Sequence, residues 1–124
     1  MGKRILVVED QEDNRRILRD LLTSVGYEII EAVTGEEGVA LAETGHPDLI
    51  LMDIQLPGID GYEATRRVRA HPTLRQVPII AVTSYALSGD DVKAKEAGCD
   101  GYVPKPFSPR ALLAKIREYL PQAV

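Results

Sequence analysis

Five side chains with charged or reactive groups follow short apolar runs in this chain of 124 residues. Glu9 and Asp10 come directly after the first run, and Asp53 comes directly after the third. Thr83 comes after the fourth run, and Lys105 follows the fifth. The set holds three carboxylates, one hydroxyl and one ammonium group. Because neighbouring carboxylates repel one another, this combination predicts a site that binds a cation.

Mg²⁺ suits these groups, because it prefers hard oxygen ligands and takes one or two carboxylates while other positions remain for water and phosphate. Three carboxylates, one divalent ion and one lysine carry no net charge together, so the site is poised to accept a phosphoryl group. A carboxylate can be the nucleophile in such a reaction and form an aspartyl phosphate. Asp53 is the expected nucleophile, because Glu9 and Asp10 then remain as a contiguous pair for the metal.

The apolar runs alternate with helical patterns, which predicts parallel βαβ units. The first, third and fourth runs are continuously apolar, as expected of strands covered on both faces. The second run is mixed and the fifth is short, so these two strands are expected at the edges, in the order 2-1-3-4-5. Right-handed crossovers then give an α/β fold, a doubly wound five-stranded parallel sheet of the flavodoxin-like type with helices on both faces. The runs cover residues 5–8, 27–31, 48–52, 78–82 and 101–103.

This topology determines where a site belongs. Ligands bind outside the carboxyl ends of parallel strands, at the point where the strand order reverses, which here lies between the first and third strands. The five side chains all follow strand ends, so they are expected to converge at this edge. The second run ends in Ala32-Val33-Thr34 and offers no comparable group.

The helical patterns carry start and stop signals of known types. The start signals are Thr34 with Glu37, Asp60 with Glu63, and Ser108 before Pro109. Gly45 is expected to cap the end of the second helix. The first helix, about 12–25, places one apolar stripe on its surface: Ile17, Leu18, Leu21, Leu22 and Val25. The fourth helix, about 89–97, has only Val92 and alanines as apolar content, and such a weakly anchored element is suited to move.

Composition excludes several classes of protein. The formal net charge of −4 disfavours nucleic acid as a partner, and 44% hydrophobic residues argue against disorder. No apolar run approaches the roughly 20 residues of a membrane helix. The run at residues 5–8, behind Lys3 and Arg4, is too short for the apolar segment of a signal peptide, so no signal peptide is expected. Cys99 is the single cysteine, so an intramolecular disulfide is ruled out. A small cytoplasmic domain is the expected class.

Five motifs in order resemble the receiver domain of bacterial two-component response regulators, the CheY-like superfamily. They are Glu9-Asp10, Asp53 with Leu56-Pro57 and Asp60-Gly61, Thr83-Ser84, Tyr102, and Lys105-Pro106-Phe107. The resemblance runs from about residue 3 to residue 120, and it is greatest to single-domain receivers of the DivK type and to receivers attached to hybrid kinases. It implies that residues 1–124 form one receiver domain with no output domain.

The resemblance also implies a role for each matching residue. Asp53 would accept a phosphoryl group from a histidine kinase or a histidine phosphotransfer protein. Glu9, Asp10, Asp53 and the backbone carbonyl of Gln55 would hold Mg²⁺. Lys105 would contact the phosphoryl oxygens, so that the chain catalyses only its own phosphorylation and dephosphorylation and is not otherwise an enzyme.

Further positions would carry the signal. Thr83 and Tyr102 would rearrange as a switch after phosphorylation, and Gln55 and Tyr85 would tune dephosphorylation, the bulky Tyr85 favouring a long-lived phosphoform. The partner would dock on Asn14, Leu18 and Pro106, although Asn14 could equally make a hydrogen bond that supports the site. The face of the fourth helix, fifth strand and fifth helix would bind a downstream protein or form a phosphorylation-dependent dimer of an otherwise monomeric chain.

Three alternatives remain open from the sequence. The chain could be a receiver excised from a multidomain regulator or hybrid kinase, or a degenerate receiver that binds partners without phosphorylation. A metal-dependent phosphatase acting through an aspartyl phosphate is the third. It is disfavoured because such enzymes of the haloacid-dehalogenase type carry a second Asp two residues after the nucleophile, where this chain has Gln55.

Overall fold

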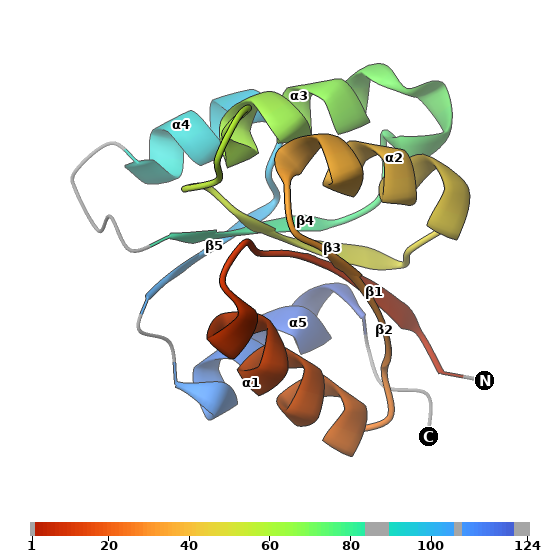
Figure 1. The fold of residues 1–124 in the computed structure, drawn as a ribbon, viewed down its shortest axis with the longest axis vertical. Coiled ribbons are helices and arrows are strands. Elements are labelled where there is room, and N and C mark those ends of the chain that lie inside the picture. Colours follow the sequence, from red (N-terminus) through yellow and green to blue (C-terminus); the bar gives the residue numbers. More distant parts are fainter. Residues whose placement is uncertain (1, 84–89, 106–107, 121–124) are drawn as a thin grey trace.

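The structure is a computed structural model that describes residues 2–83, 90–105 and 108–120, with the backbone alone at 90 and 91. Strands and helices alternate strictly over this part of the chain (Figure 1). The strands are β1 Arg4–Val8, β2 Glu28–Ala32, β3 Leu49–Asp53, β4 Ile79–Thr83 and β5 Gly101–Pro104. The helices are α1 Glu12–Ser24, α2 Gly35–Gly45, α3 Gly61–Ala70, α4 Asp90–Ala97 and α5 Pro109–Tyr119, with a short 3₁₀ turn, η1, at Pro72–Leu74. None of the described helices is long and apolar enough to cross a membrane.

The five strands form one all-parallel sheet in the order β2-β1-β3-β4-β5, which confirms the predicted fold class. The continuously apolar strands β1, β3 and β4 are interior, and β2 and β5 are the edges. Every residue of β3 and of β4 is buried, whereas β2 and β5 are only partly so. Burial on both faces therefore decides which strands are central.

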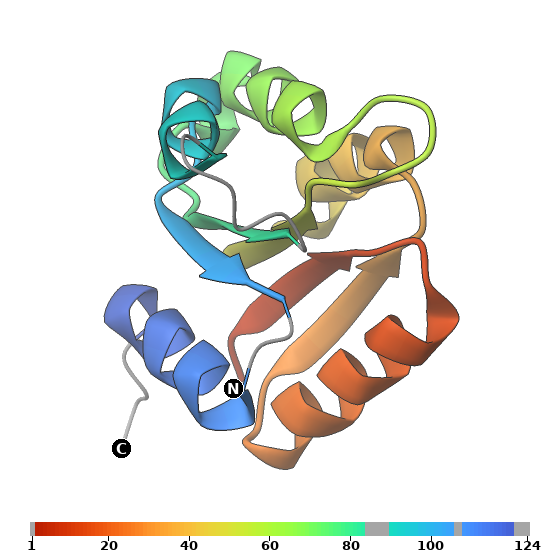
Figure 2. The same ribbon diagram turned by 90° about the vertical axis from the view of Figure 1, so that its left-hand side faces the viewer.

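Helices cover both faces of the sheet. In Figures 1 and 2, α1 and α5 lie on one face, and α2, α3 and α4 lie on the other. Each face has its own apolar core, because successive side chains of a strand point to opposite sides. On β3, for example, Leu49 and Leu51 belong to the α1–α5 core, whereas Ile50 and Met52 belong to the α2–α3–α4 core.

The three predicted helix starts are confirmed. The hydroxyl of Thr34 accepts a hydrogen bond from the Glu37 amide at 3.0 Å, and the Glu37 carboxylate accepts one from the Val33 amide at 2.7 Å. Asp60 and Ser108 cap α3 and α5 in the same way, by accepting from Glu63 N and Ala111 N. These caps satisfy amides that the helix itself leaves without partners.

Two expectations about helix surfaces are wrong. The left-handed residue that ends α2 is His46, with φ 49°, and Gly45 is the last helical residue. Ile17 is 54% exposed, because α1 turns its stripe so that Leu18 and Leu22 face the sheet. The small apolar content expected of α4 agrees with the structure, since Val92 is 53% exposed and the buried residues in the described part of the helix are Ala94 and Ala97.

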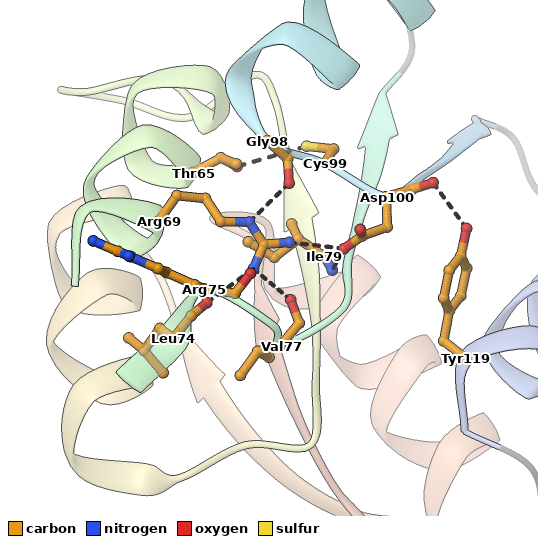
Figure 3. A network of polar contacts seen from close by, with 10 residues as sticks. All are labelled: Thr65, Arg69, Leu74, Arg75, Val77, Ile79, Gly98, Cys99, Asp100 and Tyr119. Carbon is orange, nitrogen blue, oxygen red and sulfur yellow. Dashed lines mark hydrogen bonds and ion pairs between the residues drawn. The ribbon is translucent and has the colours of Figure 1, made fainter. Parts of the chain in front are cut away.

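Arg69, near the end of α3, joins three segments at the edge of the sheet where β4 and β5 begin (Figure 3). Its guanidinium donates to the carbonyls of Leu74, Arg75 and Val77 at 2.9, 3.1 and 2.7 Å, and to Gly98 O at 2.9 Å. It also pairs with the Asp100 carboxylate at 2.7 Å, which in turn accepts from Ile79 N at 2.9 Å. Gly98 has a φ of 115°, and a Cβ there would lie 2.7 Å from Arg69 Cγ.

Replacement of Arg69 by glutamine is expected to lower the free energy of unfolding by about 2–4 kcal/mol, because several carbonyls and one carboxylate lose a charged donor. Arg66→Gln is the matched control, since Arg66 is exposed and pairs only with Glu63 among the described contacts. That variant should change stability by less than about 1 kcal/mol. Equal losses in the two variants, measured by urea unfolding, would show that the network contributes no more than a surface pair.

Candidate functional site

The acidic cluster lies at the carboxyl ends of β1 and β3, as the topology predicts. Asp53 is the last residue of β3, and Glu9 and Asp10 directly follow β1. Glu9 and Asp53 are 2% and 4% exposed, and Asp10 is on the surface. One carboxylate oxygen from each of the three lies within 4.8 Å of those of the other two. The loops that follow β1 and β3 lie on the side of the molecule that faces the viewer in Figure 2.

Lys105 is the cation that reaches this cluster. Its ammonium group donates to Glu9 Oε1 at 2.8 Å and to Asp53 Oδ2 at 3.3 Å. The backbone places it there, because Lys105 N donates to Thr83 O at 2.7 Å just beyond the pairing of β4 with β5. Two buried carboxylates thus share one half-buried ammonium, which leaves a surplus of negative charge for a further cation.

The backbone of each loop also orients a carboxylate. Gln11 N donates to Glu9 Oε2 at 3.1 Å, and Gln55 N donates to Asp53 Oδ1 at 3.1 Å. In both cases the donor is two residues beyond the acid, so the loop turns back over the side chain that it follows. Each buried carboxylate therefore has one oxygen held by backbone and the other directed to Lys105.

The protonation states follow from burial and neighbouring charges. Burial, together with the adjacent Glu9 carboxylate, raises the pKa of Asp53 to about 7, although Lys105 acts in the opposite direction. Burial alone would raise the pKa of Glu9, but the Lys105 ammonium and the Asp53 carboxyl outweigh it and lower that pKa. The pKa of Lys105 is raised because its carboxylate partners outweigh its burial. Desolvation and the Glu9 carboxyl raise the pKa of Asp10. Near neutral pH, Glu9 is therefore ionised, Lys105 is charged, and Asp53 is close to half-protonated.

The donor set fits Mg²⁺. Three carboxylates with oxygens within 4.8 Å of one another are hard ligands, and exposed Asp10 leaves the cluster open to solvent on one side. Mg²⁺ prefers such sites because it retains several of its waters. Coordination requires ionised ligands, so a bound ion would displace the proton from Asp53.

Gly61 is a site residue whose role was not apparent from its type alone. It is the first residue of α3, and its amide donates to Ile54 O at 2.9 Å. A Cβ at this position would lie 2.7 Å from Ile54 Cα and would overlap the carbonyl oxygen of Asp53. The close approach of α3 to the end of β3 therefore depends on the absence of a side chain at Gly61.

The two expected switch residues lie on neighbouring strands. Thr83 ends β4 and is 1% exposed, and Tyr102 on β5 is half-buried. Each of the two residues has at least one polar, ring or electrostatic interaction with a neighbouring group. Tyr85 and Pro106, which were expected to tune dephosphorylation and to contact a partner, lie outside the described residues.

The two residues of α1 that were expected to contact a partner differ in their exposure. Asn14 is partly exposed, and its amide donates to Gln11 Oε1 at 3.2 Å, so it braces the turn that leads from the site into α1. Leu18 is 3% exposed and packs in the α1–α5 core, so it offers a partner little surface, and its contact with one stays a prediction. Ile17 is the exposed apolar residue of this helix instead.

Fold and site together define an α/β domain in which an acidic triad and a lysine meet at the carboxyl edge of the sheet. The sequence pattern of the response regulator receiver domain matches residues 5–117. The chain belongs to that family.

Relatives match over nearly the whole chain. The polar-differentiation response regulator DivK of Brucella ovis is 43% identical over 123 residues, which are 99% of this chain and 100% of that protein. The receiver domain of sensor histidine kinase PA1611 from Pseudomonas aeruginosa, solved with a magnesium ion coordinated in its active site cleft, is 39% identical. It superposes with a TM-score of 0.91 over 98% of this chain and 100% of that one.

A third similar structure is a complex. It is the co-crystal structure of the Saccharomyces cerevisiae histidine phosphotransfer protein Ypd1 with the receiver domain of its downstream response regulator Ssk1. The matching chain is 32% identical, with a TM-score of 0.89 over 95% of this chain and 88% of that one.

Proposed function

We propose that this chain is a phosphorylation-dependent switch that accepts a phosphoryl group on Asp53 in the presence of Mg²⁺. The observation that carries the proposal is the cluster of three carboxylates within 4.8 Å of one another, with the Lys105 ammonium 3.3 Å from Asp53. A nucleophile, metal ligands and a cation for the phosphoryl oxygens are thus present at one strand edge. Response regulator receivers, the family to which the chain belongs, are components of two-component systems.

Mg²⁺ would be held by Glu9, Asp10 and Asp53, with the carbonyl of Gln55 as a further ligand that stays a prediction. The PA1611 receiver, which is 39% identical and is described with magnesium in its active site cleft, supports this assignment. When bound, the ion would neutralise the negative charge of the phosphoryl group that is transferred.

The donor would be the phosphohistidine of a histidine kinase or histidine phosphotransfer protein. Its N–P bond breaks while a bond forms between phosphorus and a carboxylate oxygen of Asp53, and the donor histidine leaves as a neutral imidazole after taking up a proton. Asp53 must be ionised to act, so displacement of its proton is part of activation. The co-crystal structure of Ypd1 with the Ssk1 receiver supports a phosphotransfer protein as one class of partner.

The output would be a change in which protein the chain binds. Phosphorylation adds charge and strong acceptor oxygens beside Thr83, and Tyr102 on β5 lies next to β4 in the sheet. A rearrangement of these two residues would alter the face formed by α4, β5 and α5. We propose no reaction on any other substrate, because the exposed amide side chain of Gln55 cannot serve as the general acid or base of a phosphatase.

The test is phosphorylation of the parent chain and of Asp53→Asn with acetyl phosphate and Mg²⁺, followed by intact-protein mass. The parent is expected to gain one phosphoryl group and the variant none, because an amide is not a nucleophile for this transfer. Asp48→Asn, which changes an acidic residue just before β3, should be phosphorylated as the parent is. Label on Asp53→Asn would reassign the acceptor, and failure of the parent to gain mass would favour a degenerate receiver.

Lys105→Ala should still gain a phosphoryl group, because Asp53 and both other acids remain, but it should lose most of the response to phosphorylation. The ammonium that links Glu9 and Asp53 is the group expected to follow the phosphoryl oxygens. The measurement is the ratio of affinities of the phosphorylated and unphosphorylated forms for a histidine phosphotransfer partner. Lys3→Ala, at an exposed position, is the control. A normal ratio in Lys105→Ala would show that Lys105 does not transmit the signal.

A further inference from the structure

Arg15 of α1 contacts the loop that carries two of the acidic groups. One guanidinium nitrogen, Nη1, donates to the backbone carbonyls of both Glu9 and Asp10, each at 3.0 Å. The side chain of Arg15 is only 15% exposed, so much of its length is packed against the protein. A single rigid, charged donor group thus bridges the two consecutive residues whose carboxylates belong to the site.

A second set of contacts orients this guanidinium. Arg15 Nε lies 3.5 Å from Glu31 Oε1 on β2. Arg19, one turn further along α1, forms two hydrogen bonds to the same carboxylate, from Nε to Oε2 at 2.8 Å and from Nη2 to Oε1 at 2.9 Å. Arg19 lowers the pKa of Glu31, so the carboxylate remains ionised and keeps its attraction for Arg15. The helix, the edge strand and the loop are thereby joined through three side chains.

This arrangement addresses a specific difficulty of the site. Glu9 and Asp10 are adjacent in sequence, and their like charges favour conformations of the loop in which the carboxylates point apart. Metal binding would have to order the loop against that repulsion, and the ordering costs conformational entropy. A donor that fixes both carbonyls before the ion arrives removes part of this cost.

We propose that Arg15 is a positioning residue for Mg²⁺: by holding the carbonyls of Glu9 and Asp10, it keeps their carboxylates in the arrangement that binds the ion. Arg15 itself does not contact the metal. The inference rests on the proposed function of the same site. Groups that support metal ligands from outside the coordination sphere affect affinity by about 10- to 100-fold, so a clear effect is expected.

The experiment is a calorimetric titration of Mg²⁺ into the full chain and into Arg15→Gln. Arg15→Gln is expected to bind Mg²⁺ about tenfold more weakly. Arg16→Gln is the matched control: it makes the same change of charge at the neighbouring position, where the arginine is exposed and pairs with Asp13. Its dissociation constant should stay within about twofold of the parent's, since long-range charge effects at exposed sites are screened.

Two further variants separate positioning from folding. Glu31→Gln should weaken Mg²⁺ binding less than Arg15→Gln, and the double variant should bind no more weakly than Arg15→Gln alone, because both changes act through one contact. Arg15→Lys retains the charge but has no planar fork, so its affinity should lie between those of the parent and Arg15→Gln. Circular dichroism and the thermal midpoint of each variant, with and without Mg²⁺, identify any that fail to fold. If Arg15→Gln does not fold, the Mg²⁺ affinities of Arg15→Lys and Glu31→Gln test the proposal instead.

The outcomes are distinct. Equal affinities of the parent and Arg15→Gln would overturn the role of Arg15 and leave the proposed function intact. Equal losses in Arg15→Gln and Arg16→Gln would also overturn it, since charge and not contact with the loop would then be responsible. A parent chain that binds no Mg²⁺ would refute the proposed function itself, together with the inference that rests on it.

Discussion

Asp53→Asn is expected to stabilise the chain in metal-free buffer at pH 8, by an amount that disappears toward pH 4. In the folded state burial and Glu9 raise the pKa of Asp53 to about 7, whereas the ordinary value is 3.8. The folded state therefore keeps a proton on Asp53 over a pH range in which the unfolded chain has lost it. As pH rises from about 4 to about 7, this difference destabilises the folded parent progressively, and asparagine, which does not ionise, escapes the penalty.

The raised pKa of Asp53 also sets an upper limit on the stabilisation that Asp53→Asn can give. Each pKa unit corresponds to about 1.4 kcal/mol, so the gain from Asp53→Asn at pH 8 is at most about 4 kcal/mol. Glu9 and Lys105 readjust when Asp53 is neutral, which makes about 1–3 kcal/mol the expected range. Saturating Mg²⁺ should reduce the gap, because the ion stabilises the parent by binding ionised Asp53.

Urea unfolding of both proteins at several pH values between 5 and 8, in the presence of a chelator, measures this difference. Asp20→Asn, the same substitution at an exposed position of α1, controls for the general effect of removing one negative charge. A stability gap that is the same at pH 5 and pH 8 would contradict the assignment, because only a group that titrates in this window produces a gap that depends on pH.

Gly61→Ala is expected to destabilise the folded chain, in contrast to Asp53→Asn, and to impair phosphorylation as well. Alanine favours a helix over glycine by about 1 kcal/mol, so propensity alone predicts stabilisation. At this position, however, the new Cβ would lie 2.7 Å from Ile54 Cα and overlap Asp53 O, and these are backbone atoms at the end of an interior strand. Relief of the overlap must displace α3 or the end of β3, at a cost of about 1–3 kcal/mol.

Gly45→Ala provides the matched control. Gly45 is the last residue of α2, and its added Cβ would meet only the Cδ1 atom of Ile30, the far end of a side chain that can move. This variant should therefore be neutral or slightly stabilised in urea unfolding. If Gly61→Ala were equally stable and took up phosphoryl from acetyl phosphate at the parent's rate, the packing of α3 against β3 would not determine the position of Asp53.

Much of the fold follows from local patterns in the sequence. The continuously apolar runs of β1, β3 and β4 predict interior strands, since only strands covered on both faces can bury such runs. The caps at Thr34, Asp60 and Ser108 predict helix starts, because they act on amides only a few residues away. The convergence of Glu9, Asp53 and Lys105 is also predictable, as parallel strands end at one edge.

Other features depend on contacts between distant segments. Ile17 and Leu18 are equally apolar, and only the packing of α1 on the sheet decides that Leu18 is buried and Ile17 is exposed. His46 and not Gly45 takes the left-handed conformation that ends α2. Arg69 and Arg66 have the same residue type on one helix, yet only Arg69 reaches across to Val77 and Asp100.

For the site, the sequence by itself determined which chemical groups are present and which strand ends carry them. The tertiary structure decided their protonation and support: the shared Lys105 ammonium, the raised pKa of Asp53, the hold of Arg15 on the loop and the close approach at Gly61. The physical reason is that residue types and strand order follow from local composition and hydrophobic pattern. Burial and electrostatic interactions, in contrast, depend on distances between atoms that are far apart in the chain.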